Sequence, residues 1–357
     1  MNTHDSKPGQ GDVIGEKKAR KGISRRSLLQ GAAAAGLAAT LGRPARVYAH
    51  TKRRVRIGYL HILSVDAQMW LMKHMGTLQK EGLEPEFVEF HTGIGGFSAL
   101  VGGSIDFLTT GGVTSNFPAR GQGKVVIPNS VEVAGQVWVN PASGIKSIAD
   151  LKGKQVATTK GTTGEIFLYS ILHSAGLSLK DVTILNQDMP AAVTTFVTKN
   201  VPAVSIWIPF NLRIQNGFPQ AQLLANARSY YPKTGYIITA YSTNNQTYEK
   251  DKDLIRRMSA AWGPANEYLL KNPEQSLEIL HHSYYKEVPL AEMKSVYKAV
   301  QPLSIAQWEG DIKNGTLYRE LDHVTNIFVT IGAIKSPLRA NQYADFSVFE
   351  SVYKRAA

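Results

Sequence analysis

The chain has 357 residues, of which 43% are apolar and 19% are charged, a composition typical of a folded protein of about two domains. It contains no cysteine, which excludes disulfides, cysteine metal sites, a cysteine nucleophile and a lipidated N-terminal cysteine. The formal net charge is +12, but residues 1–49 hold nine basic and three acidic residues. The charge left on the rest of the chain is too small, for a protein of this length, to indicate a nucleic-acid partner.

The first element in chain order is typical of an export signal. Residues 17–26 are densely basic and end in Arg25 and Arg26, and a segment of Gly, Ala and Leu follows at 28–41. Val47 and Ala49 occupy the positions of the small residues that precede a signal-peptidase cleavage site. The arginine pair resembles the twin-arginine signal, so we expect export by the twin-arginine translocase, cleavage near Ala49 and a periplasmic protein. The alternative is a cytoplasmic protein with a basic tail.

After residue 50, short apolar strands alternate with helical segments in two rounds. The first round predicts strands at 55–60, 86–90 and 105–109, with helices at 66–80 and 95–101. The second round predicts strands at 155–159, 182–185 and 203–207, with helices at 164–175 and 190–199. This alternation predicts an α/β fold whose sheets are mostly parallel and flanked by helices. Beyond residue 246 the chain is predicted to be mainly helical, most clearly at 254–270, 274–282 and 317–331.

Short motifs within residues 54–270 follow one another in a recognisable order. They are VRIGYL at 55–60, EGL at 81–83, VEF at 88–90, ALVGGSIDF at 99–107, DLKGKQVA at 150–157, KGTT at 160–163, AGL at 175–177 and WIPF at 207–210. In this order they resemble the nitrate/sulfonate/taurine family of periplasmic solute-binding proteins that serve ABC importers. One departure is Pro202 ahead of Ala203, where the family usually has Asp-Ala, and we interpret it as a local change at the start of a strand.

The resemblance implies the two-lobed type II periplasmic binding-protein fold, with the ligand cleft between the lobes. We expect the export signal at 1–49, the first lobe at 50–147 together with 241–357, and the second lobe at 148–240. The crossing strands near 140–148 and 235–242 are the predicted hinges.

The predicted site lies where strands end and helices begin, because helix N-termini there present unsatisfied N–H groups. The candidate ligand-binding residues are Ser64, Asp66, Thr110, Gly111, Gly112, Lys160, Thr162, Thr163, Glu165, Asp188 and Trp207. Glycines admit a ligand close to the backbone, hydroxyls donate hydrogen bonds, and each helix end carries about half a positive charge, so two such turns suit a small anion. An acid among them would pair with the ammonium group of a zwitterion.

Each of these residues also has a purely structural interpretation. Ser64, Thr110 and Thr162 are also suitable as plain helix N-caps. The acids would stabilise a first helical turn while facing solvent, and Lys160 would simply be solvated. The aromatic residues Phe97, Phe117 and Tyr169 either line the pocket or belong to the core.

The sequence predicts binding without catalysis. No HExxH, GxSxG or GxxxxGK motif occurs, and the nine histidines are scattered, so we expect no enzyme activity, no cofactor and no metal site. The resemblance implies a small anionic or zwitterionic solute and an ABC permease as partners, and we expect a monomer. Two alternatives remain: an enzyme of the pyrimidine-precursor synthase type, which would need a cysteine-rich motif that this chain lacks, and a ligand-sensing module for a receptor.

Overall fold

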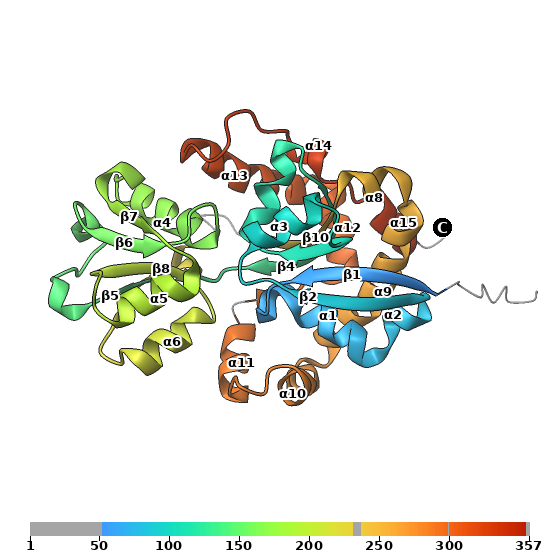
Figure 1. Cartoon of the computed structure of the whole chain (residues 1–357), viewed down its shortest axis with the longest axis horizontal. Helices are drawn as coiled ribbons and strands as arrows, with labels where there is room; N and C mark the ends of the chain where they lie inside the picture. Colours follow the sequence, from blue (N-terminus) through green and yellow to red (C-terminus); the bar gives the residue numbers. More distant parts are fainter. Residues whose placement is uncertain (1–51, 231–236, 299, 355–357) are drawn as a thin grey trace, which may run out of the picture. The chain divides into compact units, whose positions relative to one another are not determined.

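Two mixed sheets organise the chain in this computed structural model, which describes residues 52–230, 237–298 and 300–354. The expected export signal at residues 1–49 lies outside these residues and stays a prediction. In spatial order, the first sheet contains β11 (Val300–Gln301), β4 (Lys124–Glu132), β10 (Ile237–Thr243), β3 (Phe107–Thr110), β1 (Arg53–Tyr59) and β2 (Leu83–Glu89). The second sheet contains β7 (Thr183–Asn186), β6 (Gln155–Thr158), β8 (Ala203–Trp207), β5 (Gly135–Val139) and β9 (Gln222–Asn226) (Figure 1).

Helices flank both sheets, and each sheet with its helices is called a lobe here. The first lobe contains α1 (Leu63–Met75), α2 (Thr77–Lys80), α3 (Gly93–Val101), α8 (Asn245–Lys250), α9 (Lys252–Lys271), α10 (Pro273–Ser283), α11 (Leu290–Tyr297), α12 (Ile305–Lys313), α13 (Thr316–Thr330), α14 (Ala340–Tyr343) and α15 (Ser347–Tyr353). The second lobe contains α4 (Thr163–Ser174), α5 (Met189–Val197), α6 (Phe210–Gly217) and α7 (Ala227–Tyr230). Short 3-10 turns lie at Gly112–Ser115, Pro118–Arg120, Pro141–Ser143, Ala149–Leu151 and Leu179–Asp181.

The two-lobed α/β fold confirms the main prediction, but the sheets are mixed rather than mostly parallel. The predicted strands β1, β2 and β3 do pair in parallel, as do β6, β7 and β8. However, β4 and β10 pair antiparallel in the first sheet, and β5 pairs antiparallel with β8 and β9 in the second. These extra strands belong to the two passages of the chain between the lobes. Because no helix lies between β4 and β5, nothing forces β5 to run parallel to the strands beside it.

The first passage between the lobes lies earlier than we expected. Strand β4 ends at Glu132 and β5 begins at Gly135, so only Val133 and Ala134 separate a strand of the first sheet from a strand of the second. The boundary therefore falls at 133–134 and not at 147, and residues 140–148 lie wholly within the second lobe. The turn-forming residues of this stretch, Pro128, Asn129 and Ser130, lie inside β4, and Gly135 already belongs to β5, so none of them marks the change of sheet. On the return, β10 already belongs to the first sheet from Ile237 onward.

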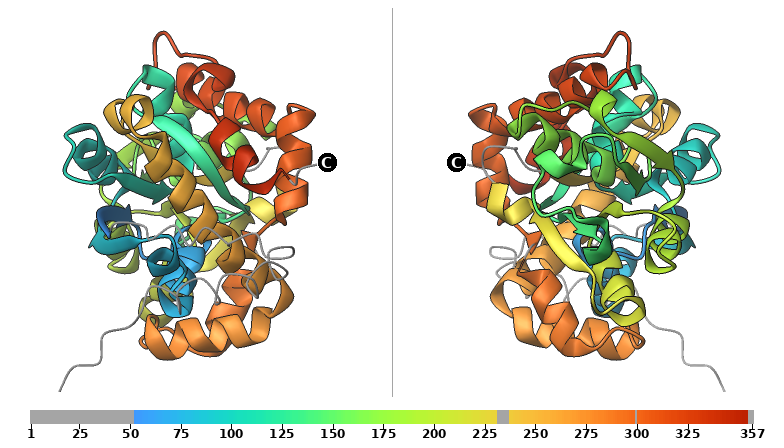
Figure 2. Two further views of the ribbon diagram at one scale, coloured as in Figure 1. Left: turned by 90° about the vertical axis from the view of Figure 1, so that its right-hand side faces the viewer. Right: turned by 90° about the vertical axis from the view of Figure 1, so that its left-hand side faces the viewer.

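The helix predicted at 66–80 is two helices. Gly76 adopts a left-handed conformation, with φ of 66°, which ends α1 and begins α2. The C-terminal helices, orange to red in Figure 2, return to the first lobe, where α9 packs against α1 and α15. The fully buried Trp262 of α9 donates its indole N–H to the Asn129 side chain of β4 at 2.9 Å, which fixes this helix against the sheet.

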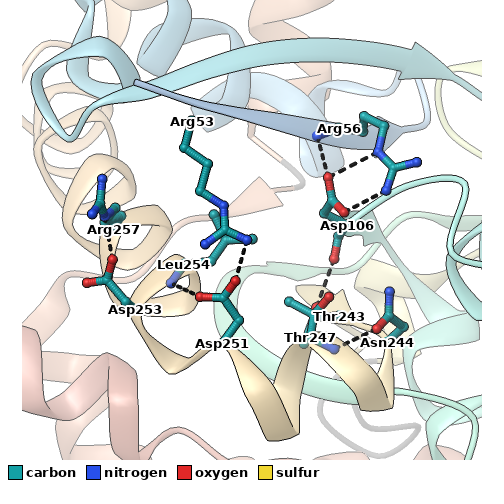
Figure 3. Close-up of polar contacts among 10 residues, drawn as sticks. All are labelled: Arg53, Arg56, Asp106, Thr243, Asn244, Thr247, Asp251, Asp253, Leu254 and Arg257. Atoms are coloured by element: carbon teal, nitrogen blue, oxygen red, sulfur yellow. Dashed lines mark hydrogen bonds and ion pairs between the residues drawn. The ribbon is translucent and has the colours of Figure 1, made fainter. Parts of the chain in front are cut away.

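Asp106, just before β3, holds three strands of the first sheet together. Its carboxylate accepts the Arg56 backbone N–H at 2.8 Å and the Arg56 guanidinium at 2.8 and 3.2 Å, while its carbonyl accepts the Thr243 hydroxyl at 2.8 Å (Figure 3). In the second lobe Pro202 occupies the position that corresponds to this acid. It directly precedes the paired residue Ala203, so it removes no hydrogen bond from the strand.

Candidate functional site

Six of the predicted residues meet around one small cavity, which we call the central cavity. Its volume is about 30 Å³. The first lobe contributes the turn after β3 and the end of β4, and the second contributes the turn before α4 and the end of β8. The lining residues are Leu60, Ile62, Val65, Gly93, Thr110, Gly111, Gly112, Val113, Glu132, Thr162, Thr163 and Trp207. Turns from both lobes therefore line a common space.

The N-terminus of α4 has no side-chain cap. The Thr162 hydroxyl donates to the Thr159 carbonyl at 2.7 Å instead of accepting from the first turn of the helix. The first N–H groups of an α-helix have no acceptor within the helix, and in α4 no capping side chain supplies one. Glu165 satisfies only the Gly161 N–H, at 2.6 Å, one residue before the cap position. Thr162 therefore occupies the N-cap position, but its side chain does not cap the helix.

Trp207, which lines the central cavity, carries an unpaired indole N–H. This side chain is only 5% exposed, and its Nε1 has no hydrogen-bond partner in the described part of the chain. A buried N–H without an acceptor costs about 1–3 kcal/mol. A ligand oxygen in the central cavity would remove that cost.

Glycines bring the two lobes into contact beside α4. A Cβ added at Gly112 would lie 3.2 Å from the Thr163 backbone nitrogen and 3.1 Å from its hydroxyl oxygen. A Cβ at Gly111 would lie 3.7 Å from the Thr163 hydroxyl oxygen, and 3.2 Å from Oε2 of Glu132 in its own lobe. Larger residues in the first lobe would therefore hold the α4 N-terminus away from it.

Glu132 is a functional candidate that the sequence analysis missed. It is 3% exposed and accepts the Ser64 hydroxyl at 3.1 Å. Burial raises the pKa of Glu132 to about 7, although the hydrogen bond from Ser64 lowers it. Ser64 thus reaches the site through Glu132 and is not the N-cap of α1, which is Ile62. The available signal was a lone charged residue inside the long apolar run of β4 and β5.

A larger cavity of about 560 Å³, which we call the tail cavity, adjoins the central one and shares Leu60 and Ile62 with it. Its other lining residues are His61, Glu89, Phe90, His91, Pro190, Pro209, Phe210, Leu212, Arg213, Asn216, Tyr285, Glu287, Val288, Pro289 and Glu292. Most of its lining is apolar, with a few charged side chains. None of these residues was predicted from the sequence, because they come from loops, from Glu89 at the end of β2 and from the helices α5, α6 and α11.

Asp66 does not line either cavity but supports the wall of the tail cavity. It is fully buried in α1, where it lies 2.9 Å from Nδ1 of His61 and accepts the Trp70 indole N–H at 2.8 Å and the Tyr285 hydroxyl. The other ring nitrogen of His61 lies 3.1 Å from the Tyr284 carbonyl. Since both ring nitrogens face acceptors, we infer that His61 is an imidazolium.

The electrostatics of His61 agree with that protonation state. Burial lowers the pKa of His61, but the hydrogen bond and the charge of Asp66 outweigh burial, so the pKa is raised. The ring also stacks on Tyr285 with centroids 4.1 Å apart. Asp66 therefore orients a cation in the tail cavity instead of contacting ligand itself.

Lys160 and Glu165 lie on another opening, which has a volume of about 420 Å³ and also includes Arg120. Asp188 caps α5, where it accepts the Ala191 N–H at 3.2 Å, and it lines none of the three cavities described here. For Asp188, the alternative interpretation as an acid that stabilises the start of a helix therefore applies.

The three aromatic residues considered alongside them have separate roles. Phe97 is in the core and stacks on Phe117, which reaches the opening that contains Lys160. Tyr169 stacks on His173 within α4. None of these rings lines the central cavity.

Comparisons with known proteins show which family the chain resembles. A model of the NMT1/THI5-like family matches residues 129–276. A protein of Brucella abortus named as a binding protein is 30% identical over 290 residues, which cover 81% of this chain and 89% of that protein. The chain belongs to the NMT1/THI5-like family. The aliphatic sulfonates-binding protein of Escherichia coli is also 30% identical, over 63% of this chain and 70% of its own length.

Solved structures support the fold of this NMT1/THI5-like protein. The alkanesulfonate-binding protein SsuA of Xanthomonas axonopodis bound to MOPS has a TM-score of 0.62 at 23% identity, covering 84% of this chain and all of that one. The desulfurization enzyme DszB has a TM-score of 0.60 at 12% identity, covering 85% of this chain and all of that one. Binding proteins and an enzyme thus share the fold, and the site has to distinguish between them.

The described residues of the NMT1/THI5-like chain contain neither a helix suited to crossing a membrane nor a cluster of metal-ligating side chains. Within residues 52–230, 237–298 and 300–354, no helix is both long and apolar enough to cross a bilayer. The same residues contain no group of three or more His, Asp or Glu side chains placed to hold a metal ion.

Proposed function

We propose that this chain is the periplasmic solute-binding component of an ABC importer, and that it captures a small anionic or zwitterionic solute by lobe closure. The observation that carries the proposal is the central cavity, which is lined by the uncapped N-terminus of α4, by Trp207 with its unpaired indole N–H, and by the glycine turn of the other lobe. These groups are hydrogen-bond donors, and an anion supplies the acceptors they lack.

The charge distribution favours a strong-acid anion with spread charge. No Lys or Arg lines the central cavity in the described residues, so the positive potential there comes from main-chain dipoles. The twelve residues of α4 are enough for its N-terminus to carry about half a positive charge. Thr110, Thr162 and Thr163 can add hydroxyl donors. The three oxygens of a sulfonate would use several such donors at once.

The size of the cavities favours an organic solute over nitrate. A volume of about 30 Å³ leaves room for about two water molecules, so a sulfonate enters only when the lobes move apart. We place that movement at Val133 and Ala134, between β4 and β5. The tail cavity adjoining the central one has room for an organic group. The sulfonates named for the E. coli relative fit this combination of polar head and apolar tail.

The remaining parts of the proposal concern where the protein acts. The arginine pair and apolar segment before Ala49 support export by the twin-arginine translocase and release into the periplasm. A permease in the inner membrane would then accept the closed form, and no catalysis is proposed. Taurine and nitrate remain candidate solutes beside the alkanesulfonates.

Calorimetry and thermal unfolding on ligand-free protein test this function. The panel is ethanesulfonate, butanesulfonate, taurine, nitrate and MOPS, with butanol and butylamine as controls that lack the anion. A solute at a hundredfold excess over its Kd stabilises the folded protein by about 2.7 kcal/mol, a shift of several degrees in Tm. We expect anions to raise Tm, the two controls to have no effect, and the bound solute to be recovered unchanged by mass spectrometry. If the whole panel left Tm unchanged, or if the recovered solute were altered, the proposal would be wrong.

A further inference from the structure

Glu132 is the ionisable residue closest to the proposed anion site. It is the only side chain lining the central cavity, among the residues that the structure describes, that ionises near neutral pH. It ends β4, where Ile237 of β10 and Val300 of β11 flank it in the sheet. At 3% exposure it has almost no access to bulk water.

The surroundings of Glu132 contain nothing to balance a negative charge. Its hydrogen bond from Ser64 is neutral, and burial is the main influence on its ionisation, with no charged partner contributing among the described residues. The close approach of Gly111 to Oε2 leaves little space for water on that side. A carboxyl group in this position is more stable with its proton than without it.

Other titratable groups nearby are directed elsewhere. On the elements packed against β4, and on α4, they are Asp66, Lys73, His74, Glu165, Tyr169, His173, Tyr241, Glu350 and Tyr353. None of them lines the central cavity. His61 lines the adjoining tail cavity and is an alternative source of pH dependence, because burial lowers its pKa but Asp66 outweighs burial and raises it.

We propose that Glu132 contacts the solute as a neutral carboxyl, donating its proton as a hydrogen bond to an oxygen of the anion, so that binding takes up one proton when the pH is above neutral. This inference rests on the proposed function and makes Glu132 a specificity-determining residue. An ionised carboxylate at the same place would repel the anion, whereas the neutral group adds one more donor to a site composed of donors.

The proton balance is simple. Below neutral pH the free protein already holds the proton on Glu132, and the anion binds without exchange. Above neutral pH the carboxylate, one solvent proton and the anion combine into a complex in which the carboxyl is neutral. The Kd should therefore be constant at low pH and rise about tenfold per pH unit above about pH 7.

Titration calorimetry with butanesulfonate tests the inference. This solute stays ionised throughout pH 5.5–9, so any proton exchanged belongs to the protein. Measuring the enthalpy in two buffers of different ionisation enthalpy that are not themselves sulfonates, such as Tris and bicine, counts the protons taken up. We expect close to one proton per solute at pH 8.5 and close to none at pH 5.5, where acetate and succinate serve as buffers.

Variants assign the proton to its site. Glu132→Gln keeps a donor of similar shape, so it should bind butanesulfonate with a pH-independent Kd and without proton uptake. Glu165→Gln is the matched control, since burial raises the pKa of that carboxyl as well, and its proton uptake should match the wild type.

The outcomes separate the two proposals. Binding without proton uptake in the wild type would overturn the inference while leaving the proposed function intact. Uptake that persists in Glu132→Gln and disappears in His61→Gln would also overturn it. If Glu132→Gln failed to fold, His61→Gln would decide: proton uptake that persists there supports the inference, and uptake that disappears there overturns it. If no anion bound the wild type at any pH, the proposed function itself would fail.

Discussion

The contact between the glycine turn and α4 gives a sharp test of lobe closure. In Gly112→Ala, the new methyl carbon would lie 2.9 Å from Cδ1 of Ile166, 3.1 Å from the Thr163 hydroxyl oxygen and 3.2 Å from the Thr163 nitrogen. The isoleucine methyl can rotate away, but the backbone nitrogen moves only with the whole second lobe. The Gly112 backbone is outside the left-handed region, so alanine brings no conformational strain of its own.

The expected change in Kd for Gly112→Ala follows from overpacking of the closed, solute-bound form. Inserting a methylene into a filled contact costs about 1–3 kcal/mol. If that cost falls only on the closed, solute-bound form, the Kd rises by about 5- to 150-fold. The ligand-free open form should unfold at nearly the wild-type temperature, because the clash is absent there.

Calorimetry with butanesulfonate measures this change directly. Gly310→Ala is the control, because nothing lies within 4 Å of its added Cβ in α12. It should leave the Kd unchanged and stabilise the helix by about 0.5–1 kcal/mol. A Gly112→Ala variant with a wild-type Kd would show that this contact is not part of the bound state, and the closure argument would be refuted.

Three more predictions concern the buried acids Asp66 and Glu132 and the arginine pair of the expected export signal. Asp66→Ala should lower the free energy of unfolding by about 3–5 kcal/mol in denaturant titrations, since it leaves His61 and Tyr285 without their buried acceptor, and a loss below 1 kcal/mol would contradict this assignment. The raised pKa of Glu132 means that the folded protein holds a proton that the unfolded chain releases, so wild-type stability should fall as pH rises from 4.5 to about 7. Glu132→Gln should therefore be more stable than wild type at pH 8, by up to about 3 kcal/mol, and equal to it near pH 4, whereas parallel stability curves would argue against a neutral Glu132. Replacing Arg25 and Arg26 with lysine should leave the protein in the cytoplasm, as cell fractionation would show, and unchanged export would exclude the twin-arginine route.

Local sequence patterns were sufficient for the elements that begin each lobe. The strands β1, β6 and β8 and the helices α4 and α9 appear where apolar periodicity predicted them, because their apolar faces are set by neighbours close in the chain. The turns at Thr110–Gly112 and Thr162–Thr163 were also recognisable, since parallel strands bring such turns to one edge of a sheet. The sequence by itself therefore determined the fold class and identified the turns that line the central cavity.

Only the tertiary structure decided which residues face the solute. The hydroxyl of Thr162 turned out to bond backward and leave α4 uncapped, and Asp188 turned out to be a cap. The change of sheet at 133–134 and the burial of Glu132 depend on pairing with β8, β10 and β11, which lie far away in the chain. Burial and hydrogen-bond partners are properties of such distant contacts, and for that reason no local pattern could supply them.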